Sequence, residues 1–288
     1  MAGAVRPGGL RARRRLLFPR IKRPLVHPIL FQLGPLTIHT YGALLALGAG
    51  LGIVLLVRLA GSAGLDQERV LALATWVLVM AVAGSRLFYV LIEPAQFLRR
   101  PWEVFYLWQG GLVFYGGLLG GLATAWWLAR RWGLRLLPLM DSFAPALALG
   151  QAIGRLGCFS AGCCYGLPWP GGWAAVTFSD PLSLASPLGL ELHPTQIYTA
   201  ASLAAICGLL LWRWPRRRFA GQVFCTYGLL HGLARVIIEQ FRGDWRGEAL
   251  LGFLTPTALA ALGLALASAL GLVLLRKQPQ APAPEQAP

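Results

Sequence analysis

The sequence predicts an all-α, polytopic integral membrane protein with about seven transmembrane helices. Hydrophobic residues make up 56% of the 288-residue chain and charged residues only 13%, and the mean hydropathy is +0.59. A soluble globular protein carries about 25% charged residues. The apolar residues also gather in runs of roughly 20, which is the length that a helix needs to cross the hydrocarbon of a bilayer.

The predicted spans follow from these apolar runs. Residues 27–40 are too short and too interrupted to cross a membrane. Among the later runs the fourth is the weakest, because Pro145 and several glycines interrupt it. We expect the spans at residues 41–60, 70–92, 112–132, 139–157, 197–214, 220–238 and 250–275.

Both ends of the chain differ from the transmembrane domain, which we expect to cover residues 27–276. Residues 1–26 form a basic arm without the apolar core of a cleavable signal peptide, and we expect this arm to be disordered or to lie on a membrane surface. Residues 277–288 are rich in Pro and Ala, which also predicts disorder.

The basic residues predict an orientation rather than a nucleic-acid partner. The net charge is +15, but no long basic face is evident, and the clusters between apolar runs are typical of cytoplasmic flanks. The C-terminus is therefore predicted to be cytoplasmic and the loop 158–196 to lie outside. The basic arm contradicts this orientation unless the arm is a start-site artefact, the later loops dominate, or the number of spans differs by one from seven. Loops after the odd-numbered spans hold eleven basic residues and loops after the even-numbered spans hold four: Arg58, Arg69, Arg130, Arg131, Arg135, Arg213, Arg216, Arg217, Arg218, Arg276 and Lys277, against Arg99, Arg100, Arg242 and Arg246.

Charged residues inside the predicted spans indicate a functional interior. Each costs roughly 2.5–3.5 kcal/mol on insertion scales. Arg235, Glu239 and Arg242 are spaced four and three apart, so they share one helical face. Glu239 either pairs with an arginine as part of the bundle or belongs to a site, and the sequence leaves both readings open.

Pairing with carboxylates cannot neutralise all of these arginines. Because guanidinium groups bind phosphate oxygens through two hydrogen bonds, the surplus predicts a site for the phosphate of an anionic phospholipid, near the outer face. The arginines Arg86, Arg155, Arg235 and Arg242 outnumber the carboxylates Asp141 and Glu239 by two.

Three further stretches place polar groups beside apolar runs. They are "IHTYG" with His39 and Tyr41, "GGLVFYGGLLGG" with Tyr115, and "HPTQIY" with His193. A single histidine in such a place more often caps a helix or packs than binds a substrate. Three such patches in one chain favour a shared site.

Six stretches in this order resemble the prolipoprotein diacylglyceryl transferases: "IHTYG", "AGSRLFYVL", "GGLVFYGGLLGG", "DSFAPALALGQAIGRLG", "HPTQIY" and "GLARVIIEQFR". The resemblance extends from about residue 28 to 275. It implies transfer of a diacylglyceryl group from phosphatidylglycerol to the lipobox cysteine in the signal peptide of a prolipoprotein, with release of glycerol phosphate. It also implies seven transmembrane helices in the bacterial cytoplasmic membrane, with no metal and no organic cofactor.

The resemblance also implies roles for individual residues. Arg155 and Arg235 match the two essential arginines of the family, which would hold and neutralise the departing phosphate. His39 and Tyr41 match a polar pair near the first span, and Gly166 matches the signature glycine. The remaining substrate-binding candidates are Arg86, His193 near the entrance, and Glu239 and Arg242 on the last catalytic-side helix.

Two departures from the family pattern concern the chemistry. Tyr115 stands where the best-studied members have a histidine that has been proposed to deprotonate the thiol. A tyrosine with an ordinary pKa near 10 is a poorer base at neutral pH, so either an arginine lowers its pKa or the base is elsewhere, such as His39. Cys158 and Cys163 replace a common asparagine and a common acidic residue.

The cysteines of "GRLGCFSAGCCYG" have three open readings. Cys158 and Cys163 could form a disulfide in an oxidising periplasm, or Cys158, Cys163 and Cys164 could be packing thiols. Metal or redox chemistry is the third reading, although the spacing does not fit a CxxC zinc site. Cys207 and Cys225 fall inside apolar runs and should behave as small hydrophobes.

Two alternative functions remain open. A non-catalytic paralogue could bind or transport phospholipid and leave a lipobox peptide unmodified. A membrane thiol-redox protein would lose its function when the cysteines of this stretch become serine, but not in Arg235→Ala.

Overall fold

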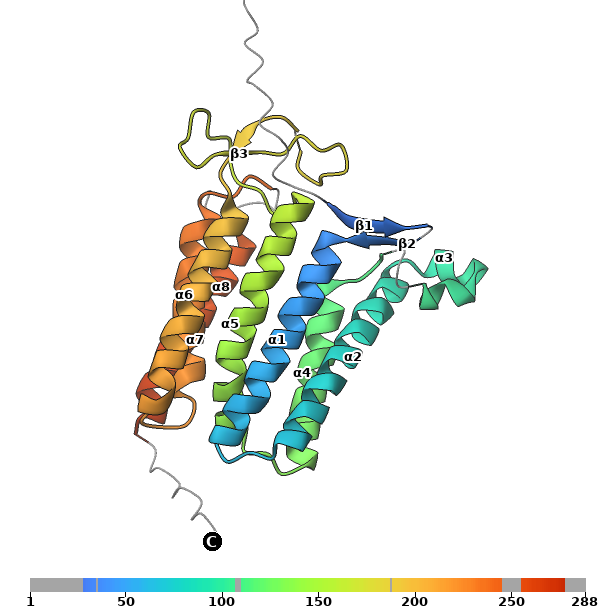
Figure 1. Ribbon diagram of the computed structural model, residues 1–288. Coiled ribbons are helices and arrows are strands. Elements are labelled where there is room, and N and C mark those ends of the chain that lie inside the picture. Colours follow the sequence, from blue (N-terminus) through green and yellow to red (C-terminus); the bar gives the residue numbers. More distant parts are fainter. Residues whose placement is uncertain (1–27, 35, 107–109, 187, 245–254, 278–288) are drawn as a thin grey trace, which may run out of the picture.

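The computed structural model describes residues 28–34, 36–106, 110–186, 188–244 and 255–277. In these residues, seven long helices lie side by side in one bundle (Figure 1). Each falls where a span was predicted, with ends that differ by a few residues. The helices are α1 (Thr40–Ser62), α2 (Gln67–Ile92), α4 (Phe114–Arg131), α5 (Leu136–Ala161), α6 (Thr195–Arg213), α7 (Gln222–Glu239) and α8 (Pro256–Leu275).

The helical fold class is confirmed. Five helical segments in the described chain are long and apolar enough to cross a membrane: α1, α2, α5, α6 with the short turn η3 (Trp214–Arg216), and α8. The helices α4 and α7 occupy two more predicted positions but are not in that set, so the count of seven spans stays a prediction. Most long apolar side chains on the bundle surface are exposed, as expected of a protein surrounded by lipid.

Small residues let neighbouring helices approach closely. A Cβ added to Gly48 of α1 would lie 2.8 Å from the carbonyl oxygen of Gly150 in α5. Gly84 of α2 and Gly116 of α4 face each other's backbones in the same way. Without a hydrophobic driving force between helices in lipid, this close packing is a main source of helix association.

Pro145 does not break α5, which runs continuously to Ala161. Four residues before it, the carboxylate of Asp141 is 1% exposed and accepts hydrogen bonds from the amides of Gly221 and Phe224, at 2.7 and 2.9 Å. These amides lie at the start of α7, where unpaired N–H groups attract a negative charge. Asp141 therefore joins two helices and does not neutralise the arginines.

Short elements outside the seven helices were not predicted. The hairpin of β1 (Ile29–Leu33) and β2 (Leu36–His39) precedes α1, in the segment that was expected not to span. A second small sheet pairs β3 (Val176–Thr177) with β4 (Glu191–Leu192) in the loop between α5 and α6. The helical turns α3 (Pro94–Arg99) and η1 (Pro101–Phe105) project sideways from the bundle (Figure 1).

The two predicted terminal segments remain untested. The basic arm, residues 1–26, lies outside the described residues, as does all of the predicted tail except Lys277.

Candidate functional site

The candidate site lies where α1, α5 and α7 meet, near the end of the bundle that bears the α5–α6 loop. Arg155 of α5 lies within electrostatic range of Tyr41 in α1 and of His231 in α7. Its side chain is half-buried, and it forms no hydrogen bond or ion pair with any other residue that the structure describes. Arg155 is thus a cation inside the bundle without a carboxylate partner among those residues.

The other two arginines of this site pair with carboxylates. Arg235 contacts Glu239 at 2.6 Å, and their side chains are 12% and 3% exposed. Glu239 also accepts hydrogen bonds from the hydroxyl groups of Thr255 and Thr257 at the start of α8. The pairing reading of Glu239 is therefore what the structure shows, and it ties α7 to α8.

Arg242 follows α7 and binds Asp244 through two hydrogen bonds, at 2.8 and 2.7 Å. Within the described part of the site, three arginines thus face two carboxylates. The surplus is one positive charge, carried by Arg155, instead of the two that the residue count predicted.

Arg86 lies apart from these arginines and is 5% exposed. Its guanidinium donates to the carbonyl oxygens of Val104 at 2.9 Å and Gly110 at 2.7 Å, and also to those of residues 103, 106 and 111. The rings of Tyr89 and Phe97 lie 5.4 and 5.3 Å from its guanidinium carbon. Arg86 ties residues 103–106, 110 and 111 to α2, and its predicted contact with substrate stays a prediction.

Gly166 lies where three backbone segments meet. Its amide donates to the His193 carbonyl at 3.1 Å, and the next amide, of Leu167, donates to the Phe241 carbonyl at 2.8 Å. A Cβ on Gly166 would lie 2.5 Å from His193 Cβ and 2.7 Å from the Phe241 oxygen. No larger residue fits, so this glycine joins the α5–α6 loop to the chain after α7.

The side chain of His193 packs against neighbouring aromatic residues. Its ring stacks on Trp169, with centroids 4.3 Å apart and an interplanar angle of 9°, and its Nδ1 lies 3.1 Å from the Tyr198 hydroxyl. These contacts support the packing reading of this histidine, and its predicted place at the entrance stays a prediction.

The two predicted bases, Tyr115 and His39, are exposed side chains without a described contact to Arg155. Tyr115, in the first turn of α4, is 68% exposed and has an edge-on ring contact with Phe114. His39 is exposed at the end of β2 and does not cap α1 with its side chain. No described contact joins either residue to Arg155. Tyr41, the partner of His39 in the predicted polar pair, does reach Arg155 electrostatically.

His231 is a site residue that the sequence analysis missed. Its ring stacks on Tyr227 at 5.3 Å with an interplanar angle of 12°, and both Arg155 and Arg235 act on it electrostatically. It precedes Arg235 by four residues, which places both on one face of α7. That spacing was the available signal.

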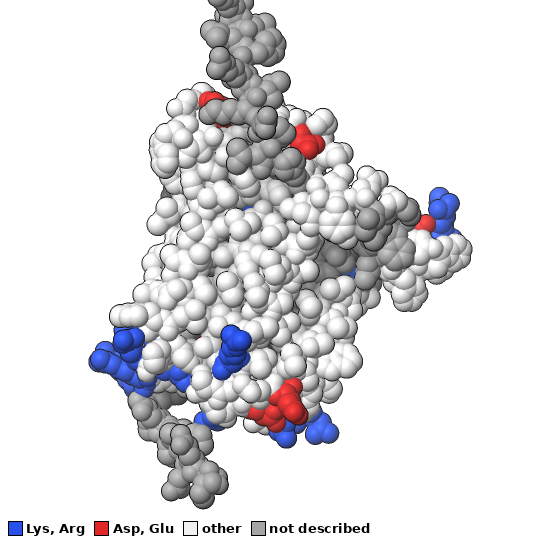
Figure 2. Space-filling view, in the orientation of Figure 1, with Lys and Arg blue, Asp and Glu red and all other residues white. Residues whose placement is uncertain are grey.

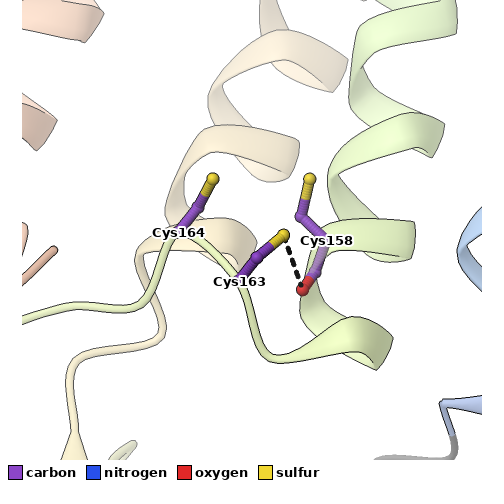
Figure 3. Close-up of side chains that lie close together, drawn as sticks. All are labelled: Cys158, Cys163 and Cys164. Atoms are coloured by element: carbon purple, nitrogen blue, oxygen red, sulfur yellow. Dashed lines mark hydrogen bonds between the residues drawn. The ribbon is translucent and has the colours of Figure 1, made fainter. Parts of the chain in front are cut away.

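Three cysteines converge beside the site (Figure 3). Cys158 lies in the last turn of α5, and Cys163 and Cys164 follow in the loop. The sulfur atoms of all three lie within 4.8 Å of one another. None forms a disulfide, whereas Cys207 and Cys225 are buried between helices as predicted. Hydrogen bonds from Cys158 and Cys163, and then from Arg242, lower the pKa of the Cys164 thiol.

A groove of about 520 Å³ lies at the opposite end of the bundle, where α7 begins and α8 ends, and is separate from this site. Its lining residues are Phe219, Gln222, Leu272, Val273, Arg276 and Lys277.

Comparison with known proteins yields one family. Residues 28–274 match the family model of prolipoprotein diacylglyceryl transferase. Three relatives named phosphatidylglycerol–prolipoprotein diacylglyceryl transferase are similar to the chain. The Synechococcus elongatus protein is 35% identical over 85% of this chain and 86% of its own length. The Thermus thermophilus protein is 34% identical over 85% and 96%, and the Clostridium tetani protein is 32% identical over 77% and 87%.

Proposed function

The chain belongs to the prolipoprotein diacylglyceryl transferase family, and we propose that it moves the diacylglyceryl group of phosphatidylglycerol to the lipobox cysteine of prolipoproteins. In this reaction the thiolate sulfur forms a bond to the glyceryl carbon. The bond from that carbon to the phosphate oxygen breaks, and glycerol phosphate leaves with the electron pair. The observation that supports this function best is Arg155, a half-buried cation whose charge no described carboxylate neutralises.

Arg155 and Arg235 would stabilise the departing phosphate. Both act on His231, so an anion beside that residue is within electrostatic reach of both guanidinium groups. Preorganised donors of this kind act on charge as it develops in the transition state. Tyr41 lies close enough to Arg155 to contact the same headgroup.

Three of the predicted binding residues fit better as positioning residues. Glu239 orients Arg235 through their ion pair, and Arg86 holds Val104 and Gly110 in place through their carbonyl oxygens. Gly166 lets the chain after α7, which includes Arg242, approach the α5–α6 loop.

We place the thiol proton on His231. It lies beside both arginines. Histidine is also the side chain that most often serves as a general base. The residues that the family resemblance favours, Tyr115 and His39, are exposed and lack a described contact with these arginines. Tyr115 and His39 remain the alternative bases, and the pH dependence of activity in variants of the three residues distinguishes them from His231.

The charge distribution supports a membrane orientation. On the face in Figure 2, Lys and Arg gather at the end of the bundle opposite the α5–α6 loop. That loop contains no Lys or Arg between residues 162 and 194. By the positive-inside rule, we place the C-terminus in the cytoplasm and the candidate site toward the outer leaflet of the bacterial cytoplasmic membrane.

Complementation tests this function. The chain, with and without residues 1–26, would be expressed in a strain depleted of its own transferase, and the mass of one lipoprotein followed. We expect the diacylglyceryl mass shift, and its loss in Arg235→Ala. A folded, membrane-inserted protein that gives no shift would instead support the non-catalytic phospholipid-binding alternative. A protein that gives no shift, and whose own thiol-redox activity is lost with serine at residues 158, 163 and 164 but kept in Arg235→Ala, would support the thiol-redox alternative.

A further inference from the structure

The three cysteines beside the site form a compact set of sulfur donors (Figure 3). The last turn of α5 supplies Cys158, and the loop that follows brings Cys163 and Cys164 back toward it. All three sulfur atoms lie within 4.8 Å of one another. In a trigonal metal–thiolate centre with metal–sulfur bonds of about 2.3 Å, the sulfur atoms are about 4 Å apart. The three sulfur atoms therefore need to move only slightly closer together to bind one metal ion.

The backbone of this loop is built so that the sulfur atoms converge. Gly162 ends α5 with φ of 75°, and Cys164 has φ of 61°, a conformation that residues other than glycine rarely adopt. Such strain persists only where surrounding contacts impose it, and it is concentrated at functional sites.

Two buried side chains at the start of α6 impose this conformation. Thr195 is 0% exposed and donates to the Cys164 carbonyl at 2.7 Å. Gln196 is 1% exposed and donates to the Cys163 carbonyl at 2.8 Å. The two loop cysteines are therefore positioned through their backbones. Cys163 Sγ also donates to the Cys158 carbonyl oxygen at 3.7 Å, and the three sulfur atoms stay close together (Figure 3).

The donor set selects a class of metal. Thiolates bind soft ions such as copper(I) and zinc. Of these two ions, zinc in proteins is almost always four-coordinate and would need a fourth ligand. The described cluster contains three sulfur atoms and no histidine or carboxylate. Three sulfur donors around a monovalent ion match this cluster better than a tetrahedral zinc site.

Neighbouring charge favours the resulting anionic centre. One copper(I) ion with three thiolates carries a net charge of −2. Arg242 acts on Cys164 through a hydrogen bond and its charge, and Arg155 acts on Cys158 electrostatically. These guanidinium groups offset charge that would otherwise be costly next to lipid.

We propose that Cys158, Cys163 and Cys164 bind one copper(I) ion as three thiolates. Each thiol releases one proton as it coordinates, and neither the ion nor the sulfur changes oxidation state. The ion ties the end of α5 to the loop that joins Gly166, His193 and Arg242, so it stabilises the frame of the neighbouring site. This proposal does not depend on the transferase activity.

Metal binding by the full-length protein in detergent micelles tests it. The reduced protein would receive copper(I) without oxygen, in competition with a copper(I) chelator such as bathocuproine disulfonate. We expect one copper ion per chain and an X-ray absorption spectrum that shows three sulfur neighbours and no nitrogen. In Cys158→Ser we expect two sulfur neighbours and an affinity at least about 10-fold lower, since losing even an outer partner of a ligand costs that much.

A matched control uses the two cysteines that lie elsewhere. The double variant Cys207→Ala/Cys225→Ala should keep one copper ion per chain and the three-sulfur spectrum. Alkylation of the wild-type thiols before copper is added should abolish binding without any mutation.

Three outcomes would overturn the proposal. The first is a folded wild-type protein that retains no copper against the chelator. The second is a higher affinity for zinc, with a four-ligand spectrum. The third is a wild-type protein that, purified without reductant, is 2 Da lighter than its reduced form and contains a disulfide among these three cysteines.

Discussion

Two arginines inside the bundle, Arg86 and Arg155, have contrasting surroundings. Arg86 donates to backbone carbonyls of the segment 103–111, so the protein itself supplies the compensating dipoles. Arg155 has no hydrogen-bond or ion-pair partner among the residues that the structure describes. Since an unpaired cation in a membrane helix is costly, Arg155 is expected to bind an anionic group of a substrate.

Arg155→Gln should therefore lower kcat with little effect on folding. We expect a loss of about 100- to 1,000-fold, as for removal of one preorganised donor in other enzymes. Arg155→Lys should recover only part of this loss, because an ammonium group cannot bind phosphate through a planar fork. The matched control is Arg58→Gln, which replaces an exposed arginine near the end of α1 that is far from Tyr41. Diacylglyceryl transfer to a lipobox peptide is the measurement, and equal activity of both glutamine variants would contradict the assignment.

His231 and the two bases favoured by the resemblance can be separated by their pH profiles. If His231 accepts the thiol proton, activity should rise with pH as its imidazole loses its proton. His231→Asn should lower activity by about 100- to 10,000-fold and remove this rise. Tyr115→Phe and His39→Asn should keep it. The assignment is wrong if Tyr115→Phe removes the pH dependence while His231→Asn retains it.

Gly166 leaves no space for a side chain, and Gly208, which does, provides a matched comparison. A Cβ at residue 166 would lie 2.5 Å from the His193 carbonyl oxygen, whereas one at Gly208 would meet nothing within 4 Å. Gly166→Ala should lower the free energy of unfolding by about 1–3 kcal/mol, the usual cost of overpacking. Gly208→Ala, inside α6, should be neutral or stabilising by up to about 1 kcal/mol. Denaturation in micelles would measure both, and equal effects would refute the steric explanation.

At the level of elements, hydropathy predicted the positions of the long helices, because these depend on the local sequence. The long helices fall where apolar runs predicted them, because in lipid each apolar run must satisfy its backbone within itself. Pro145 made the fourth span look weak, but α5 continues through it, which neighbouring helices can stabilise. The small sheets and the projecting turns α3 and η1 depend on contacts with distant residues, such as those of Arg86 with segment 103–111. Their own sequences gave no signal for them.

The junction of α5 and α7 gives an element-scale prediction. Asp141→Ala would leave the amides of Gly221 and Phe224 buried without their acceptor. We expect a loss of about 1–3 kcal/mol of stability per unsatisfied group, and a smaller effect on activity in the protein that remains folded. Asp66→Ala removes a comparable but exposed cap at the start of α2, and should cost about 1 kcal/mol. Thermal unfolding in micelles would rank the two, and the reverse order would contradict the role of Asp141.

Over the whole molecule, the sequence named candidate site residues but not the partners of their side chains. It named Arg155 and Arg235, but which arginine keeps a surplus charge depends on contacts between helices. Asp141 was counted as a possible partner, yet it caps α7 from 80 residues away. His231 was missed because its significance comes from Arg155 of another helix. Residue types and spacing identify candidates, and only the assembled bundle shows which of them meet.

The orientation of the bundle is the prediction at this largest scale. The eleven basic residues of one set of loops should hold the C-terminus in the cytoplasm even when residues 1–26 are deleted. A protease recognition sequence would be inserted at Gly189, where the chain is open to a larger residue, or after Lys277. Protease added to spheroplasts should cut the first protein only, and protease added to inverted vesicles should cut the second only. Cleavage of both proteins in spheroplasts would contradict the predicted orientation. An orientation that reverses when the basic arm is deleted would show that the arm, and not the loops, determines topology.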